Sequence, residues 1–168
     1  MLDLTSGVTG FANSIQKWPT GVTAGLVGGA AEILWIAIYM HLVGGEATVV
    51  ARGITESVFP NLVTPATAVP LGIAIHMGLA VMLGVAIFIF VRSLLPRTAP
   101  ALLEPLVLVG LLVCVWVTNF FLILPAINPA FVALVPYSAS LFSKVLFGVA
   151  AALVLKLYDG FHLASKPL

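Results

Sequence analysis

The sequence predicts an all-α integral membrane protein with four transmembrane helices in a bundle and an N-terminal interfacial amphipathic helix. Composition is the first observation behind this prediction. Apolar residues make up 61% of the 168 residues, charged residues make up 8%, and the mean hydropathy is +1.20. Soluble domains are roughly 45–50% apolar and about 25% charged. The composition therefore excludes a water-soluble globule, and the span lengths and proline positions support the helix count.

Four apolar stretches are long enough to cross a membrane as helices. A helix needs roughly 20 apolar residues to cross a hydrocarbon layer of ~30 Å. The stretches lie at about residues 21–43, 71–91, 103–124 and 137–158. Every proline except Pro167 lies at or near an end of one of them, as expected for a residue that lacks an N–H and favours helix starts and turns. We therefore expect a single membrane domain over residues 1–168.

Two further segments have the spacing of amphipathic helices. Apolar residues recur every three or four positions across residues 4–18: Leu4, Val8, Phe11, Ile15 and Trp18. This pattern predicts a helix lying in the headgroup plane. In the loop after the first span, one apolar face is formed by Ala47, Val50, Ile54 and Val58, and it is opposed by Glu46, Arg52 and Glu56. We expect a surface helix there, covering the outer mouth of the bundle.

The distribution of lysine and arginine predicts the orientation in the membrane. Five cations lie on the side that holds both termini: Lys17, Arg92, Arg97, Lys156 and Lys166. The connections on the opposite side carry only Arg52. Because cytoplasmic loops carry the excess of Lys and Arg, we expect a multi-pass protein of the plasma membrane, the inner membrane in a bacterium, with both termini cytoplasmic.

Polar residues within the spans are the candidate functional residues. Five of them fall in the middle or outer half of the membrane: Glu32, His41, His76, Asn119 and Lys144. The candidate site residues are all of these except His41, together with Ser140, which shares a helix face with Lys144. A charge at the bilayer centre costs at least ~2.5–3.5 kcal/mol, so such residues usually face protein or water. Glycine, alanine and serine recur at four-residue spacing beside them, which favours close helix contacts on the same faces. We expect a vestibule open to the outer side, with Ser143 also in its lining and Glu32 paired with Lys144.

Several classes of function are excluded or left unsupported. The formal net charge is only +1 and the chain has no basic stripe, so we expect no nucleic-acid partner. The single cysteine, Cys114, cannot form an internal disulfide or a thiolate metal site alone. The sequence also lacks the nucleophile-elbow, P-loop and H-E-x-x-H motifs. We therefore expect a non-enzymatic protein.

The leading functional hypothesis is a membrane protein that moves or gates a small polar solute or a proton. In it Glu32 and Lys144 form a switchable charge pair, His76 responds to protons, and Asn119 and Ser140 line the path. The alternative is an accessory structural subunit of a larger respiratory or redox membrane complex, in which the same cluster only fixes helix register. Four helices enclose little volume, so we expect the chain to form a homo-oligomer or to join larger membrane subunits.

A third hypothesis is a membrane protein that binds haem or copper. Met40–His41 and His76–Met77 offer thioether and imidazole donors, which suit copper or a b-type haem. The chain has only three histidines and lacks H-x-x-x-H and C-x-x-C-H elements. The leading hypothesis accordingly includes neither a metal nor another cofactor.

Overall fold

The computed structural model describes residues 18–95, 100 and 102–164, the last six of these by their backbone only. This part of the chain is helical and contains no strand. The interfacial helix expected at residues 4–18 lies outside the described residues, apart from Trp18, where the first long helix begins.

Within the described residues, four helices are long and apolar enough to span a membrane, as the sequence predicts. They are α2 (Trp18–Leu42), α4 (Ala68–Leu94), the continuous stretch Leu103–Ile127, and α8 (Tyr137–Ala164), which is apolar enough over Tyr137–Tyr158. Each helix reaches or exceeds its predicted length. The first and second begin three residues before the predicted starts, because Pro19 and Pro70 lie inside the first helical turn, where an N–H is not needed.

The third long helix continues past the predicted end at residue 124. It consists of α5 (Leu103–Thr118), a π-helical turn η2 (Asn119–Ile123) and α6 (Leu124–Ile127). Pro125 explains the irregular turn, because a proline ring clashes with the carbonyl four residues before it and offers no N–H to that carbonyl. The wider π turn carries the helix past this point.

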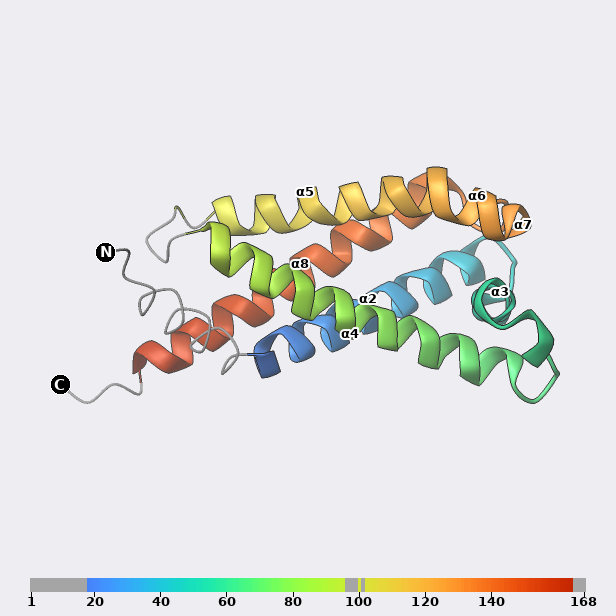
Figure 1. Cartoon of the computed structure of the whole chain (residues 1–168), viewed down its shortest axis with the longest axis horizontal. Coiled ribbons are helices and arrows are strands. Elements are labelled where there is room, and N and C mark those ends of the chain that lie inside the picture. Colours follow the sequence, from blue (N-terminus) through green and yellow to red (C-terminus); the bar gives the residue numbers. More distant parts are fainter. Residues whose placement is uncertain (1–17, 96–99, 101, 165–168) are drawn as a thin grey trace, which may run out of the picture.

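The long helices pack unequally around one another. α2 packs extensively on both α4 and α8, and α5 packs on α8, whereas α4 and α5 contact each other much less. We call the end with Trp18, Leu94 of α4, Leu103 of α5 and Ala164 the terminus end. The opposite end, with the connecting helix α3 (Ala47–Val58), is the α3 end (Figure 1).

Small residues allow α2 and α4 to approach closely. A Cβ atom added to Gly84 of α4 would lie 2.5 Å from the Cα atom of Gly25 in α2, and one added to Gly25 would lie 2.5 Å from the Ala80 carbonyl oxygen. These distances are too short for any side chain, so the two backbones touch here. The expectation that the glycine row of the first span forms a helix contact is confirmed.

All four long helices contribute to an apolar core at the terminus end. Its buried members are Ala24, Ala80, Ile87, Phe88, Val91, Leu108, Leu112, Phe147, Ala151 and Leu155. Phe147 lies directly against the face of Gly28, where an added Cβ would be 2.8 Å from its ring. This half of the bundle is therefore filled by side chains.

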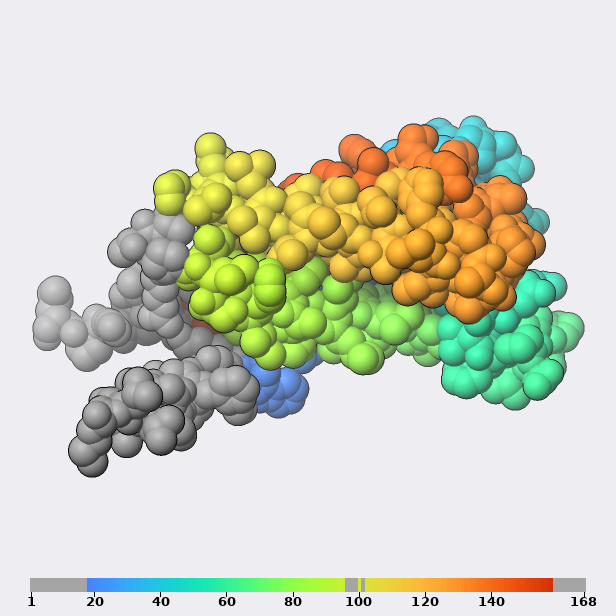
Figure 2. Space-filling model, turned by 45° about the horizontal axis from the view of Figure 1, so that its top comes forward, coloured from blue at the N-terminus to red at the C-terminus, as the bar shows by residue number. Residues whose placement is uncertain are grey.

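At the other end, α3 is the surface helix that the sequence predicts. Its Thr55 hydroxyl donates a hydrogen bond to the Ala68 carbonyl at 2.5 Å, and Gly53 allows Phe131 of α7 (Pro129–Val132) to approach. Figure 2 shows the resulting surface, on which the orange residues of α6 and α7 adjoin the teal surface of α3. Asn128 caps α7 and also donates to Ser57 of α3 at 3.0 Å. Together, α3 and α7 cover the α3 end.

Candidate functional site

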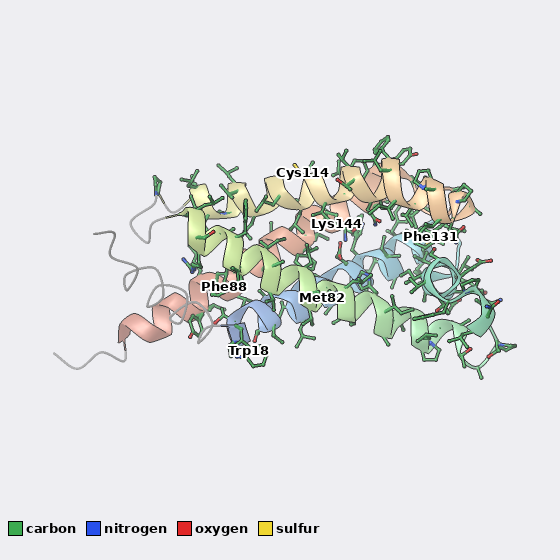
Figure 3. All side chains as sticks on the ribbon, viewed as in Figure 1. Trp18, Met82, Phe88, Cys114, Phe131 and Lys144 are labelled. Atoms are coloured by element: carbon green, nitrogen blue, oxygen red, sulfur yellow. The ribbon has the colours of Figure 1, made fainter. Side chains whose placement is uncertain are left out.

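Glu32 and Lys144 form a buried ion pair between α2 and α8. Lys144 Nζ lies 2.7 Å from Glu32 Oε1, and only 3% of the Glu32 side chain is exposed. Glu32 reaches this position because its helix face continues the glycine face of α2, beside Gly28 and Gly29. Figure 3 shows Lys144 within the bundle, whereas Cys114 points away from it. The pairing predicted from depth and helix face is present.

His76 of α4 is the third member of this charged cluster. Its Nε2 atom lies 3.6 Å from Glu32 Oε2. The Nε2 separation exceeds the usual hydrogen-bond range of about 2.7–3.2 Å. Nε2 is buried and makes no hydrogen bond within the described part of the chain. An ångström of movement would therefore create or remove a contact between His76 and Glu32.

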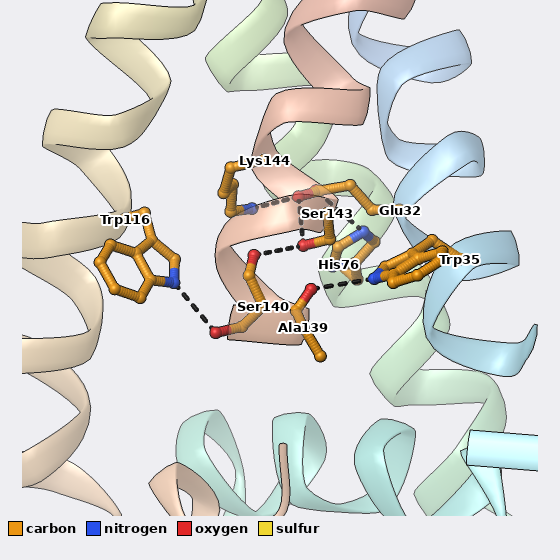
Figure 4. Close-up of polar contacts among 8 residues, drawn as sticks. All are labelled: Glu32, Trp35, His76, Trp116, Ala139, Ser140, Ser143 and Lys144. Carbon is orange, nitrogen blue, oxygen red and sulfur yellow. Dashed lines mark hydrogen bonds and ion pairs between the residues drawn. The ribbon is translucent and has the colours of Figure 1, made fainter. Parts of the chain in front are cut away.

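The two neighbouring serines of α8 both line the cavity, but they make different contacts. Ser143, not Ser140, reaches the carboxylate: its Oγ donates to Glu32 Oε1 at 3.3 Å and also lies 2.7 Å from the Ser140 carbonyl (Figure 4). Ser140 Oγ donates to the Tyr137 carbonyl at 3.1 Å. The sequence placed both serines in the vestibule, and the rotation of α8 decides which one touches the acid.

Two tryptophans hold the first turn of α8 in place. Trp116 Nε1 of α5 donates to Ser140 Oγ at 3.0 Å, and Trp35 Nε1 of α2 donates to the Ala139 carbonyl at 2.9 Å (Figure 4). The indoles thus fix α8 from two sides, one turn before Lys144. Neither contact was predicted, because a sequence shows which residues can donate but not which carbonyl faces them.

The charged cluster lies at one side of a cavity of about 520 Å³. All five predicted site residues line it: Glu32, His76, Asn119, Ser140 and Lys144. Its remaining walls are mostly apolar and come from α2, α3, α4, α7 and the third long helix. The apolar face predicted for α3 lies over the cavity, since Ala47, Val50, Ile54 and Val58 all belong to the lining. The volume is within the range of roughly 300–1,000 Å³ found for small-molecule sites.

Asn119 contributes an amide that is not used within the protein. It lines the cavity at the start of the π turn, and its side chain makes no hydrogen bond to any residue that the structure describes. π turns often occur at functional sites. In the sequence, the signal for this turn is Pro125, which follows shortly after Asn119 inside an apolar span.

The candidate metal ligands do not converge on one site. His41 ends α2 with an exposed side chain and is not in the cavity lining, whereas Met40 is buried among apolar residues at the α3 end. Met77 packs against Gly29. Across residues 18–95 and 102–158, no group of three or more His, Cys, Asp or Glu side chains is placed to hold a metal ion.

The chain matches no protein-family model, no curated protein and no solved structure, so its function must be inferred from this site.

Proposed function

We propose that this protein is a non-enzymatic membrane protein that moves or gates a small polar solute or a proton. The observation that carries the proposal is the Glu32–Lys144 ion pair, which lies beside His76 on a cavity in an apolar bundle. Charges within a membrane are costly and usually functional. A pair that only fixed helix register would not need a cavity beside it.

The three charged or titratable groups suit a switch. Glu32 and Lys144 neutralise each other, and a proton on Glu32 or an anion on Lys144 weakens the pair. His76 is the residue type that gains or loses a proton near neutral pH, and its Nε2 lies just beyond hydrogen-bond distance from Glu32. In this proposal His76 tightens or releases Glu32, while Asn119 and Ser140 line the space for the solute.

The packed terminus end closes the bundle on one side of the cavity, which favours gated movement over an open pore. The apolar core at the terminus end is closed by Leu108, Leu112 and Phe147, each at most 1% exposed. We propose that the four long helices cross the membrane as a bundle with the α3 end outside, in accordance with the charge bias. Passage then requires the terminus end to open while the charged cluster changes state.

The accessory-subunit hypothesis receives less support from the contacts. Lys144 has its carboxylate within the same chain, so it does not need an acidic residue of a partner subunit. Native purification separates the two hypotheses, since an accessory subunit co-purifies with larger subunits in fixed stoichiometry. The haem or copper hypothesis predicts a Soret band or bound copper that is lost in His76→Ala.

Proton flux through the reconstituted full chain tests the proposal. Vesicles of phosphatidylcholine and phosphatidylglycerol enclose a pH-sensitive dye, and a potassium diffusion potential drives proton movement. We expect the wild-type chain to raise the flux above that of protein-free vesicles. Glu32→Gln and Lys144→Met should return it to the protein-free level, because each removes one partner of the switch.

Folding and reconstitution need a matched control. Leu153 is exposed on α8, the helix that carries Lys144, so Leu153→Ala should keep the wild-type flux. The double variant Glu32→Gln/Lys144→Met removes both charges and leaves neither one unpaired. Wild-type flux in the well-folded double variant would remove the charged cluster from the mechanism, and a wild-type chain that adds no flux would overturn proton movement.

A further inference from the structure

The cavity combines apolar walls with one polar floor. Its charged groups belong only to the Glu32–Lys144–His76 cluster, while the walls include Ile33, Ile36, Val69, Ile73, Leu79, Leu83, Val115 and Phe120. A fully polar solute would lose its hydration along such walls without gaining hydrogen bonds. A molecule with an apolar body and one polar head would match both regions. The lining of the site therefore favours an amphipathic solute over the fully polar one of the proposed function.

Among the neighbouring long helices around the cavity, α4 and α5 are the pair with the least mutual contact. Their separation widens from the terminus end towards the α3 end (Figure 1). The lining residues that these two helices contribute include exposed apolar side chains: Ile73 and Leu79 from α4, and Val115 and Ile127 from the third long helix. An amphipathic molecule in the membrane meets an apolar rim here.

The polar floor offers hydrogen-bond donors. Lys144 has three N–H groups, one of which is used on Glu32, and its side chain is 16% exposed. The Asn119 amide adds N–H groups with no partner in the described part of the chain. Glu32 is far less accessible, and both of its oxygens already face Lys144, Ser143 or His76. We propose that the cavity binds an amphipathic organic carboxylate, with its carboxylate on Lys144 and Asn119 and its apolar body between α4 and α5.

Charge balance couples this binding to a proton. The charged groups beside His76 are Glu32 from α2 and Lys144 from α8, while α3 and the third long helix supply only uncharged lining residues. With His76 neutral, the cluster has no net charge, so an added carboxylate would leave one uncompensated negative charge. Because a buried unpaired charge is costly, the cluster takes up one proton, on His76 or Glu32, as the carboxylate binds.

Competition photolabelling tests this inference, which rests on the proposed function and assigns it an amphipathic solute. The full chain in lipid nanodiscs is labelled with a fatty acid that carries a mid-chain diazirine, and the labelled residues are mapped by mass spectrometry. We expect labels on the cavity walls of α4 and the third long helix. Dodecanoate and dodecanesulfonate should compete, whereas dodecanol and dodecyltrimethylammonium should not. Labelling confined to the outer surface, or equal competition by dodecanol, would overturn the proposal.

Variants of Lys144 and Asn119 test the two groups that are proposed to bind the carboxylate. Lys144→Met and Asn119→Leu should each weaken competition by about 10- to 100-fold, the effect of losing a hydrogen bond to a charged group. Asn119→Leu removes no hydrogen bond within the described protein, so it tests the head group even where Lys144→Met impairs folding. Leu153→Ala should leave competition unchanged. If dodecanoate competes with labelling in well-folded Asn119→Leu and in Lys144→Met as strongly as in the wild type, the assigned head-group site is contradicted.

The sulfonate shows where the proton goes. It stays ionised throughout about pH 6–8, the range in which histidine changes charge. If the protein takes up the proton, sulfonate affinity should rise as pH falls, approaching tenfold per pH unit above the pKa of the group that takes it up. Sulfonate affinity independent of pH would overturn the proton coupling.

The two proposals fail separately. Carboxylate binding without proton or solute flux would leave this inference standing and overturn the proposed movement. Flux that depends on Glu32 and Lys144, in a chain that binds no carboxylate, would leave the proposed movement standing and overturn this inference.

Discussion

The two halves of the bundle are held together in different ways, although the same four helices pass through both. At the terminus end, small residues bring α2 and α4 into backbone contact, and apolar side chains from all four helices fill the space between them. At the α3 end, the helices separate around a cavity. An ion pair and two indole hydrogen bonds connect them there, beside a second apolar cluster that includes Trp116, Phe120 and Phe131.

The difference indicates that packing and polar contacts have separate roles in the bundle. Helices in lipid gain little from the hydrophobic effect, so close packing of small residues has to hold the terminus end. Polar contacts at the α3 end are directional and can be exchanged for contacts to a proton or a ligand. The packed half therefore fixes the register of the helices, and the polar half is the part that can change state.

The largest effect is expected from filling the contact between Gly84 and Gly25. A side chain at Gly84 would meet the Gly25 backbone at 2.5 Å, and two packed helices cannot yield there without separating. Overpacking of cores costs about 1–3 kcal/mol or more, and we expect Gly84→Leu to exceed ~3 kcal/mol. Thermal unfolding in detergent, followed by tryptophan fluorescence, measures the loss.

Gly78 provides the matched control on the same helix. A Cβ atom there has open space within 4 Å, so Gly78→Leu should keep the wild-type unfolding temperature. Equal stability of Gly84→Leu and Gly78→Leu would show that backbone contact does not hold the terminus end.

The ion pair at the α3 end should give the next largest effect. Glu32→Gln or Lys144→Met alone leaves a charge without its partner, and breaking a buried pair costs about 3–5 kcal/mol. The double variant Glu32→Gln/Lys144→Met leaves no unpaired charge, so we expect it to be more stable than either single variant. Unfolding of the three variants under identical conditions gives the coupling energy.

Additive losses of stability in the Glu32 and Lys144 variants would contradict a coupled ion pair in the polar half. If the double variant were destabilised by the full sum of the two single losses, the charges would act independently despite the 2.7 Å separation.

The sequence was sufficient to predict the spans, the α3 helix and the Glu32–Lys144 pair. Hydropathy and proline positions locate the spans, and the high cost of a lone charge in a membrane makes a pair the economical arrangement. The glycine faces of α2 and α4 also follow from four-residue spacing, because close packing requires small residues on both surfaces.

The remaining features depend on geometry that local sequence does not specify. The choice of Ser143 over Ser140 depends on the rotation of α8, and the cavity depends on how far α4 diverges from α5. The indole bond from Trp116 requires the axial shift between α5 and α8. Each of these is a relation between helices distant in the chain, so periodicity within one helix cannot reveal it.

The smallest effect on stability is expected at the ion pair between α4 and α5 at the terminus end. Arg92 Nη2 of α4 lies 3.5 Å from Glu104 Oε1 in the first turn of α5, and both side chains are partly exposed. Such pairs contribute about 0.2–1 kcal/mol and weaken in salt, and an acid in the first helical turn adds a small favourable term. We expect Glu104→Gln to lower stability by less than ~1 kcal/mol, in the unfolding assay used above.

The salt dependence of this small effect distinguishes the contribution of packing from that of the Arg92–Glu104 ion pair at the terminus end. If packing alone holds the terminus end, raising the salt concentration should reduce the difference between wild type and Glu104→Gln and leave the large loss in Gly84→Leu unchanged. A loss in Glu104→Gln as large as that in Glu32→Gln would mean that an exposed ion pair secures this end. The contrast between a packed half and a polar half would then fail, because charge would hold both.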